Sequence, residues 1–271
     1  MPEGPECETV RRALLPKVSG QIITKVFVSD KKLRTAVCEE DFASSLGRSV
    51  QTMGRKGKLL WLALGGGRSI RLRLGMTGVA RVVEYDSPRH KHTHIEIYFS
   101  EEKLQFTDPR RFGEVVPMDD AELMRTKARL GGDPSTWDDD ERIKSAAKTL
   151  KSARTIKDIL LDQSVFSGVG NIYASEVCFY AGIRPTRPGC ELGFDEMAVV
   201  LDACEAVLLA AIESCGTTFR DFAIGNGKYG ENQNSLAVFQ REGKACPRCA
   251  MSIVRIVQSG RSSFYCPRCQ L

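Results

Sequence analysis

Four cysteines near the C-terminus constrain this chain more than any other feature. Cys246 and Cys249 form one Cys-x2-Cys pair, and Cys266 and Cys269 form a second pair after sixteen intervening residues. Each pair can present two thiolates to one tetrahedral ion, so two pairs complete a closed site for one structural zinc. A unit this small cannot bury enough apolar surface to fold alone, so the metal would supply its folding free energy. Two disulfides are the alternative interpretation.

The rest of the cysteine pattern and the N-terminus indicate an intracellular protein without a membrane partner. The N-terminal segment lacks the apolar stretch of a signal peptide, and no apolar run of about 18 residues could span a membrane. A reducing compartment argues against a disulfide framework. We expect the scattered cysteines to be small buried hydrophobes. These are Cys7, Cys38, Cys178, Cys190, Cys204 and Cys215.

Positive charge is concentrated at the C-terminus. The formal net charge is +5, and the segment from Arg241 onward holds six basic residues against one acid, which accounts for all of it. Residues 253–258 and 262–265 read as two strands joined at Ser259-Gly260, which puts Arg261 beside the tip of a hairpin. An arginine there can contact a phosphate with paired donors, or it can be a solvated turn residue.

The N-terminal half reads as many short strands, which predicts an antiparallel sandwich or barrel. A short helix over 6–15, stopped by Pro16, precedes them. Residues 131–142 are polar, with Gly, Pro and an acidic run, and are interpreted as an interdomain linker or a surface loop. From 142 to 215 the period is helical, and the glycine-rich stretch 216–236 predicts a long functional loop. The expected strands lie at 22–28, 59–64, 70–74, 79–85, 94–99, 103–107 and 114–118.

The second residue is a possible nucleophile. Removal of the initiator Met would leave Pro2 with a secondary amine that titrates near ~8, so part of it is unprotonated at neutral pH. Such amines form Schiff bases with sugar or carbonyl carbons, and Glu3 beside it can act as an acid or base. Without further context, most prolines at this position are inert.

Six short motifs occur in an order that resembles a known family. They are PEGPECETVRR at the start, RKGK at 55–58, GMTG at 75–78, DPRRFG at 108–113, GVGNIYASE at 168–176 and the terminal cysteine pairs. In this order they resemble the formamidopyrimidine-DNA glycosylases and their endonuclease VIII relatives, over essentially the whole chain.

The resemblance implies an α+β architecture in which a β-sandwich flanked by helices precedes a helical domain with a helix–two-turn–helix motif and a four-cysteine zinc finger. We place the catalytic sandwich at 1–130, the linker at 131–149, the helical DNA-binding domain at 150–240 and the zinc finger at 241–271. Double-stranded DNA carrying oxidised bases or abasic sites is the implied partner of a monomeric enzyme, and the damaged nucleotide would be flipped out of the stack. In a bacterium it would work in the cytoplasm or nucleoid, and otherwise in a DNA-containing compartment.

Family roles carry over to individual positions. Pro2 matches the nucleophile that displaces the base, and Glu3 the acid/base that assists opening of the sugar ring. Lys58 and Arg261 complete the implied catalytic set, both next to DNA phosphates. The implied DNA contacts are Met76, His92, Arg110, Arg111, Phe112, Lys157, Asn171 and Lys228.

Three of these contacts would fill the gap left by the flipped base. Met76 and Phe112 are apolar wedges that can unstack a base step, and Arg110 can donate hydrogen bonds to the orphaned base. The alternative is that the two apolar residues belong to the core at strand ends. The alternating His90, His92 and His94 fit a DNA-facing or hydrogen-bonding role better than a metal site.

The motifs disagree on which kind of damaged base the enzyme would remove. Gly4 stands where the formamidopyrimidine branch has leucine and is typical of the endonuclease VIII branch. Several other motifs favour oxidised purines: 8-oxoguanine and formamidopyrimidines. Oxidised pyrimidines remain the alternative substrate, and Thr93 replaces an acidic residue that is common in the family.

Two other function classes fit part of the sequence. A non-enzymatic zinc-finger DNA-binding protein would keep the fold without Pro2 and Glu3, and this chain has both. A zinc-ribbon RNA-binding factor explains the terminal cysteines but leaves the preceding 240 residues unexplained. The sequence therefore predicts a bifunctional glycosylase and abasic-site lyase of base excision repair, which uses Schiff-base chemistry followed by β,δ-elimination.

Overall fold

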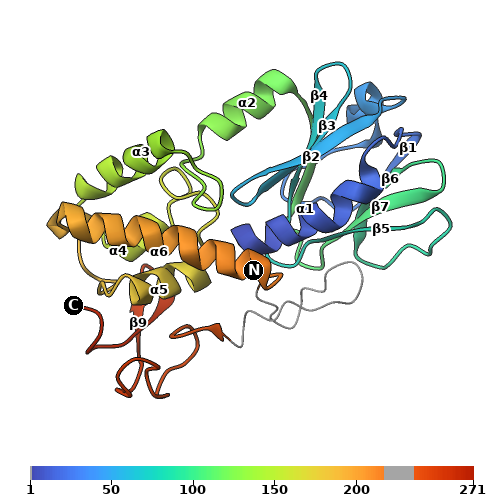
Figure 1. Cartoon of the computed structure of the whole chain (residues 1–271). Coiled ribbons are helices and arrows are strands. Elements are labelled where there is room, and N and C mark those ends of the chain that lie inside the picture. Colours follow the sequence, from blue (N-terminus) through green and yellow to red (C-terminus); the bar gives the residue numbers. More distant parts are fainter. Residues whose placement is uncertain (1, 217–234) are drawn as a thin grey trace. The chain divides into compact units, whose positions relative to one another are not determined.

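The computed structural model describes residues 2–216 and 235–271 (Figure 1). These fall into two compact units, and each is described by itself. The first holds residues 2–128 together with Cys215 and Gly216, and the second holds 129–214 and 235–271.

The first unit is built on two four-stranded antiparallel sheets. One sheet has the order β1-β6-β7-β5, made of Lys25–Val28, Thr93–Tyr98, Glu102–Thr107 and Val79–Glu84. The other has the order β2-β3-β4-β8, made of Val50–Lys56, Leu59–Leu64, Arg68–Arg73 and Glu114–Asp119. Apolar side chains of both sheets, such as Leu62, Ile70, Ile97 and Phe106, form one buried core. The predicted sandwich is confirmed.

Helical segments cover the edges of the sandwich. Helix α1, Gly4–Val18, packs on β2 and β5, which are edge strands of the two sheets. The 3-10 helix η1, Glu39–Ser45, contacts β1 and β8 at the opposite edges. Helix α2, Asp120–Ala128, packs against β4 and β8. Unpaired strand edges invite association with other chains, and these segments shield them.

Most of the predicted strands are present, but two local expectations were wrong. Strand β2 was missed, because its sequence VQTMGRK has only a weak alternation and contains a glycine. Pro16 does not stop the first helix, which continues to Val18. A proline removes one backbone donor, yet so near the C-terminus the loss is local, and Ser19 N still donates to the Leu15 carbonyl at 3.1 Å.

The second unit is helical, as predicted from the 3.6-residue period. Its helices are α3 (Asp139–Leu150), α4 (Ile156–Leu160), α5 (Asn171–Tyr180) and α6 (Phe194–Glu213), with the 3-10 helix η2 at Gly189–Glu191. The polar stretch before α3 packs within this unit: Asp133 is buried, and Trp137 lies against Phe166 with ring centroids 6.3 Å apart. The domain boundaries given above remain predictions.

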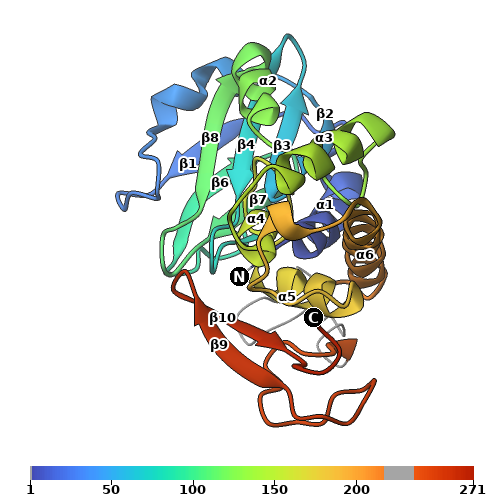
Figure 2. The same cartoon turned by 90° about the vertical axis from the view of Figure 1, so that its left-hand side faces the viewer.

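A hairpin and the cysteine turns end the chain (Figure 2). Strands β9, Val254–Gln258, and β10, Arg261–Tyr265, pair in antiparallel register, and β10 contacts α5. The chain enters this region through residues 237–239, whose backbone N–H groups donate to the buried Glu176 carboxylate at 2.7–3.0 Å. Glu176 thus fixes the start of the zinc unit to α5.

None of the helices among residues 2–216 and 235–271 is long and apolar enough to cross a bilayer.

Leu62→Ala tests the shared core of the sandwich. Leu62 is fully buried in β3, so removing its side chain should lower the free energy of unfolding by about 2–5 kcal/mol. Urea unfolding followed by tryptophan fluorescence measures this loss. Leu46→Ala, at a position that is 45% exposed, should change stability by about 0.5 kcal/mol or less. Equal losses in the two variants would contradict the assignment of the core.

Candidate active site and nucleic-acid interface

The N-terminal residues are buried at the start of helix α1. Pro2 and Glu3 are both buried, and the helix begins directly after them. The backbone N–H of Glu3 donates to a carboxylate oxygen of Glu6 at 2.7 Å. Glu6 lies in the first turn, where a carboxylate is favoured by the positive end of the helix dipole. The sequence therefore fixes the backbone next to Pro2 through a contact only three residues away.

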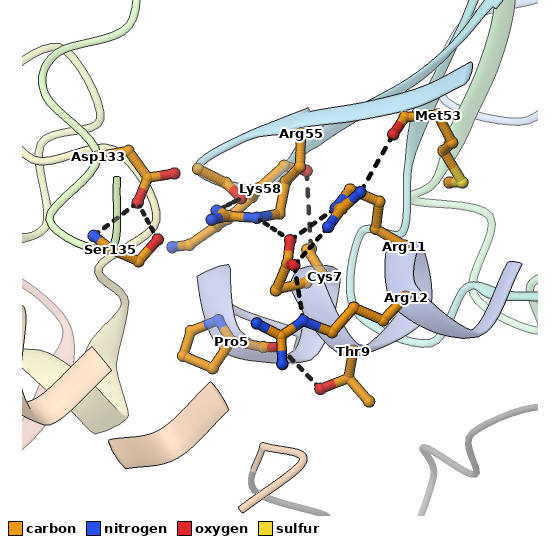
Figure 3. A network of polar contacts seen from close by, with 12 residues as sticks. Pro5, Cys7, Thr9, Arg11, Arg12, Met53, Arg55, Lys58, Asp133 and Ser135 are labelled. Atoms are coloured by element: carbon orange, nitrogen blue, oxygen red, sulfur yellow. Dashed lines mark hydrogen bonds and ion pairs between the residues drawn. The ribbon is translucent and has the colours of Figure 1, made fainter. Parts of the chain in front are cut away.

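A shared carboxylate ties this helix to the turn that carries Lys58 (Figure 3). Glu8 accepts hydrogen bonds from Arg11 at 2.8 Å, from Arg12 at 2.9 Å and from Arg55 at 2.9 Å. Burial opposes ionisation of Glu8, but hydrogen bonds from the three arginines outweigh it and lower its pKa to about 2.

The same network reaches the turn itself. Arg55 also donates to the carbonyl of Gly57 at 3.0 Å, and the thiol of Cys7 contacts the carbonyl of Lys58 at 3.8 Å. Pro2, Glu3 and Lys58 thus belong to one connected element of the first unit.

A second buried carboxylate assembles the residues expected to fill the flipped-base gap. Asp108 accepts from the Thr77 hydroxyl at 2.5 Å, from Arg110 N at 3.1 Å and from Gly113 N at 2.7 Å. These bonds join the loop after β4 to the loop before β8. Thr77 adjoins Met76, so both predicted segments are held by one side chain.

The two loops also touch directly. Gly75 has a φ of +62°, and a Cβ there would lie 2.6 Å from the backbone carbon of Phe112, so only glycine fits. Met76 is 38% exposed and Phe112 is 45% exposed, and the Arg110 guanidinium lies 4.9 Å from the Phe112 ring centre. Exposed large apolar side chains next to a cation are the arrangement expected of wedges. The alternative that Met76 and Phe112 belong to the core is wrong.

The three histidines differ in their surroundings. His94 is buried, and its ring nitrogens lie 3.0 Å from the Ser29 hydroxyl and 3.0 Å from the Asp108 carbonyl, which confirms a hydrogen-bonding role for it. His92 is partly exposed, and its ring centre lies 5.6 Å from that of His90. Among the described residues, the only grouping fit for a metal is the cysteine cluster, so the histidines form no metal site there. Arg111, in the neighbouring loop, is exposed.

In the second unit, α4 and α5 flank a tight turn, as the helix–two-turn–helix motif requires. Gln163 orders the turn by donating to the Val169 carbonyl at 2.8 Å and accepting from Gly168 N at 3.0 Å. Helix α5 begins at Asn171, as predicted. The Asn171 side-chain amide donates to the Ser262 carbonyl at 3.2 Å.

Lys157 is hydrogen-bonded to the β9–β10 hairpin within this unit. The Lys157 ammonium, on the buried α4, lies 2.8 Å from the Ser262 carbonyl and 2.7 Å from the Ser263 hydroxyl. Two predicted DNA contacts, Lys157 and Asn171, thus also hold the residue after Arg261. Lys228, another predicted contact, and most of the predicted loop lie outside the described residues.

Arg261 opens β10 directly after the Ser259-Gly260 turn, as predicted. Both turn residues have positive φ, at +47° and +75°, which fits a tight two-residue hairpin turn. The Arg261 side chain is exposed and forms no hydrogen bond or ion pair within the part of the chain that the structure describes. By contrast, Arg248 is engaged internally and donates to the Phe179 and Tyr180 carbonyls at the C-terminal end of α5.

The four terminal cysteines fit one zinc ion. Their sulfur atoms all lie within 4.8 Å of one another. The Cys246–Cys269 and Cys249–Cys266 sulfur distances are 3.9 and 3.4 Å. Sulfurs placed about 2.3 Å from one tetrahedral ion are separated by about 3.8 Å, whereas a disulfide bond is about 2.0 Å long. These cysteines would hold a structural zinc that closes both turns, and the disulfide alternative is wrong.

Three segments of the chain match models of known protein families. Residues 1–115 match the N-terminal domain of formamidopyrimidine-DNA glycosylase, residues 130–223 match its H2TH domain, and residues 243–271 match the zinc finger found in FPG and IleRS. A formamidopyrimidine-DNA glycosylase of Thiobacillus denitrificans is 38% identical over 272 residues, which cover all of both chains. The chain belongs to the formamidopyrimidine-DNA glycosylase family. The family member of Colwellia psychrerythraea is 39% identical over all of this chain and 99% of its own length.

Solved structures of the family agree with the fold. Lactococcus lactis Fpg in complex with DNA containing N7-benzyl-Fapy-dG has a TM-score of 0.90, with 32% identity over 99% of both chains. The same protein in complex with DNA containing an oxidised pyrimidine has a TM-score of 0.89, again with 32% identity over 99% of both chains.

Sequence reasoning missed the residues that hold the site in place. Asp108 lies inside a quoted motif but was given no role, and Glu8 and Glu176 were likewise unassigned. All three lie inside the quoted motifs, but nothing in their local sequence shows that they are buried. Only the folded chain shows which donors each carboxylate meets.

Glu8→Gln should lower the free energy of unfolding by about 1–3 kcal/mol at pH 7, because it removes the charge that holds three arginines. The pKa of Glu8 falls from 4.5 to about 2 on folding, so this contribution is complete above pH 4.5 and is lost as the pH falls toward 2. Urea unfolding of both proteins at pH 7, 5 and 3 measures it, with exposed Glu122→Gln as the control. A difference that grows as the pH falls would refute the assignment.

Cys266→Ser should abolish zinc binding, since the remaining three thiolates no longer close the tetrahedron. Elemental analysis of protein purified without chelator should find about one zinc per chain before the change and almost none after it. Of the scattered cysteines, Cys7, Cys178 and Cys204 are buried as expected, but the expectation was wrong for the exposed Cys38, Cys190 and Cys215. Cys190→Ser, outside the cluster, should keep the zinc. A full zinc content in Cys266→Ser would show that the metal lies elsewhere.

Proposed function

We propose that this chain is a bifunctional DNA glycosylase and abasic-site lyase that removes oxidised purines from DNA. One observation carries the proposal: a chain that matches formamidopyrimidine-DNA glycosylases over their full length holds Pro2 and Glu3 at the start of α1. A zinc-finger protein that had lost its chemistry would have no need of this pair.

Pro2 is the proposed nucleophile. A secondary α-amine is less basic than a lysine, and the positive end of α1 favours its unprotonated form further. The nitrogen attacks C1′ of the damaged nucleotide, the bond from C1′ to the base breaks, and the base leaves with that electron pair and takes up a proton. Glu3 supplies a proton to the ring oxygen as the sugar opens to a Schiff base.

The lyase steps follow from the Schiff base. Loss of a C2′ proton drives cleavage of the C3′–O bond, and a second elimination cleaves the C5′–O bond. Each elimination releases a phosphate-terminated strand, and water then hydrolyses the Schiff base, which frees the sugar fragment from Pro2. The reaction uses no oxidant, and a zinc ion held by the four thiolates would have no open coordination position with which to join it.

The DNA contacts are proposals that rest on charge and exposure. Lys58, His92 and Arg111 belong to the first unit, and Asn171 and Arg261 to the second. Arg111 and Arg261 are exposed and Lys58 and His92 partly exposed, and such basic side chains, like the N–H groups at a helix start, are suited to backbone phosphates. The Met76, Arg110 and Phe112 cluster is suited to the gap in the stack. Lys157 is assigned to the lesion strand by the family resemblance, and its contacts here support a role in holding the hairpin as well.

Oxidised pyrimidines are the second candidate substrate. Gly4, which opens α1, departs from the purine-specific pattern, and a relative has been crystallised with DNA containing an oxidised pyrimidine. We place the enzyme in the DNA-containing compartment of the cell, in keeping with the bacterial relatives.

Borohydride trapping tests the function directly. Labelled duplexes would carry 8-oxoguanine opposite cytosine, an oxidised pyrimidine, an abasic site or no damage, and borohydride converts a Schiff base to a stable adduct. We expect an adduct on the 8-oxoguanine and abasic duplexes and none on undamaged DNA. Trapping mainly on the pyrimidine duplex would show that the enzyme prefers oxidised pyrimidines. No adduct even on abasic DNA would refute the enzyme.

Blocking the N-terminus identifies the nucleophile. Protein that keeps an uncleaved N-terminal tag should give no adduct but should still bind DNA, and removal of the tag to expose Pro2 should restore trapping. The two preparations share one sequence after residue 2, so folding is matched. Pro2→Gly should likewise lose most of the covalent chemistry. Full trapping by the tagged protein would assign the nucleophile to another amine.

A further inference from the structure

A third buried carboxylate lies in the first unit, on strand β6. The side chain of Glu96 is 0% exposed. It accepts hydrogen bonds from the Tyr98 hydroxyl at 2.6 Å, the Gln105 amide at 2.9 Å and the Arg89 guanidinium at 2.9 Å. The Lys103 ammonium lies 3.2 Å away. Every residue of β6 is buried, so a segment of chain covers the face of the sheet that bears Glu96.

That covering segment is the stretch 86–92, which we call the roof segment. Lys103 donates to the Ser87 carbonyl at 2.8 Å, and Gln105 donates to the Pro88 carbonyl at 3.4 Å. The Arg89 guanidinium lies 3.3 Å from the centre of the Phe27 ring, besides its bonds to Glu96. Three consecutive residues of the roof segment are therefore fastened to the sheet, and all three attachments meet at Glu96.

The charge of Glu96 is what gathers these donors. Burial alone would raise its pKa, but the hydrogen bonds from Tyr98, Gln105 and Arg89 outweigh burial and hold the pKa below its usual value. An ionised carboxylate out of water is tolerated only where such donors surround it. A neutral amide at this position could not retain all of them.

The roof segment ends in basic side chains. His90 and Lys91 are exposed and His92 is partly exposed. Burial, together with the charges of Lys91, His90, His94 and Lys31, lowers the pKa of His92, so positive groups dominate its surroundings. His94, just beyond, binds both the Ser29 hydroxyl and the Asp108 carbonyl and so holds this end against two neighbouring loops.

We propose that Glu96 is a positioning residue for DNA binding: it fastens the roof segment to the sheet and so presents His90, Lys91 and His92 in a preformed arrangement to the phosphate backbone. The proposal rests on the DNA-binding function proposed above. Its physical basis is that ordering a mobile segment at the moment of binding costs affinity, and a segment that is already ordered avoids this cost. Glu96 touches neither DNA nor the reacting atoms.

The change in net charge and the positioning role predict opposite effects of Glu96→Gln on DNA affinity. Glu96→Gln removes one negative charge, which by itself would leave DNA affinity equal or improved. The positioning role predicts weaker binding. Glu101→Gln makes the same charge change at an exposed residue between β6 and β7 and serves as the matched control. Arg89→Gln is the second variant, since it removes the fastening at a half-exposed side chain and leaves Glu96 its other donors.

The first measurement is amide hydrogen exchange in the free protein. In Glu96→Gln, amide exchange across the roof segment should be about tenfold faster, and exchange in the core strands should be unchanged. Arg89→Gln should show a smaller change in the same segment, and Glu101→Gln none. Unchanged protection of this segment in both Glu96→Gln and Arg89→Gln would overturn the proposal.

The second measurement is the Kd for an undamaged duplex and for a duplex with a stable abasic-site analogue, each over a range of salt. Glu96→Gln should raise Kd by about 5- to 10-fold on both duplexes and lower the salt slope by about 1. The change in Kd should exceed any change in single-turnover rate at saturating DNA. Adding Lys91→Ala to Glu96→Gln should cost less than the two separate losses together, because both act through one segment. Unchanged or tighter binding, or full additivity, would overturn the proposal.

The outcomes separate this inference from the proposed function. Binding by the native protein with an unaltered Kd in Glu96→Gln refutes the positioning role alone. Native protein that gives no borohydride adduct but loses DNA affinity in Glu96→Gln refutes the enzyme and leaves the positioning role standing. Native protein that binds no duplex refutes both.

Discussion

An ionised carboxylate removed from water must be surrounded by donors, and this requirement organises the functional segments of the chain. Glu8 draws three arginines together and so connects the helix behind Pro2 with the turn at Lys58. Asp108 joins the two loops that bear Met76, Arg110 and Phe112. In each case one buried side chain joins separate segments of the chain, because a buried charge left unpaired would cost several kcal/mol.

The second unit has one buried acidic side chain and one buried cation that fix the chain in a related way. Glu176 accepts three successive backbone N–H groups at the entrance to the zinc unit, although burial outweighs these donors and raises its pKa. Lys157 is the inverse case, a buried cation that donates to the carbonyl and hydroxyl of hairpin residues. Between these two anchors the zinc site closes the turns, so Arg261 stands on a hairpin fixed from several sides. This rigidity favours a phosphate contact, because an arginine must be correctly oriented to donate two hydrogen bonds to one phosphate.

Much of the fold could be predicted because apolar periodicity and turn residues are local signals. Strand β3, the hairpin around Ser259-Gly260 and the start of α5 at Asn171 all lie where the sequence indicated. Strand β2 was missed because it has few apolar residues, and it forms because β3 and α1 give it partners. The continuation of α1 past Pro16 has a similar cause, since packing of Val18 in the core outweighs one lost backbone bond.

The sequence by itself determined the chemistry this chain can support: a secondary amine at Pro2, four thiolates at zinc spacing, and the ordered motifs of one family. Those properties reside in residue types and short spacings, which need no folded chain to be read. Only the tertiary structure decided which groups act together. Glu96 on a strand reads as a solvent-facing residue, yet it is buried beneath residues 86–92, and Asp108 meets Thr77 from a loop thirty-one residues earlier. The burial of a charge and the choice of its partners depend on contacts between distant segments, and local sequence carries no record of these.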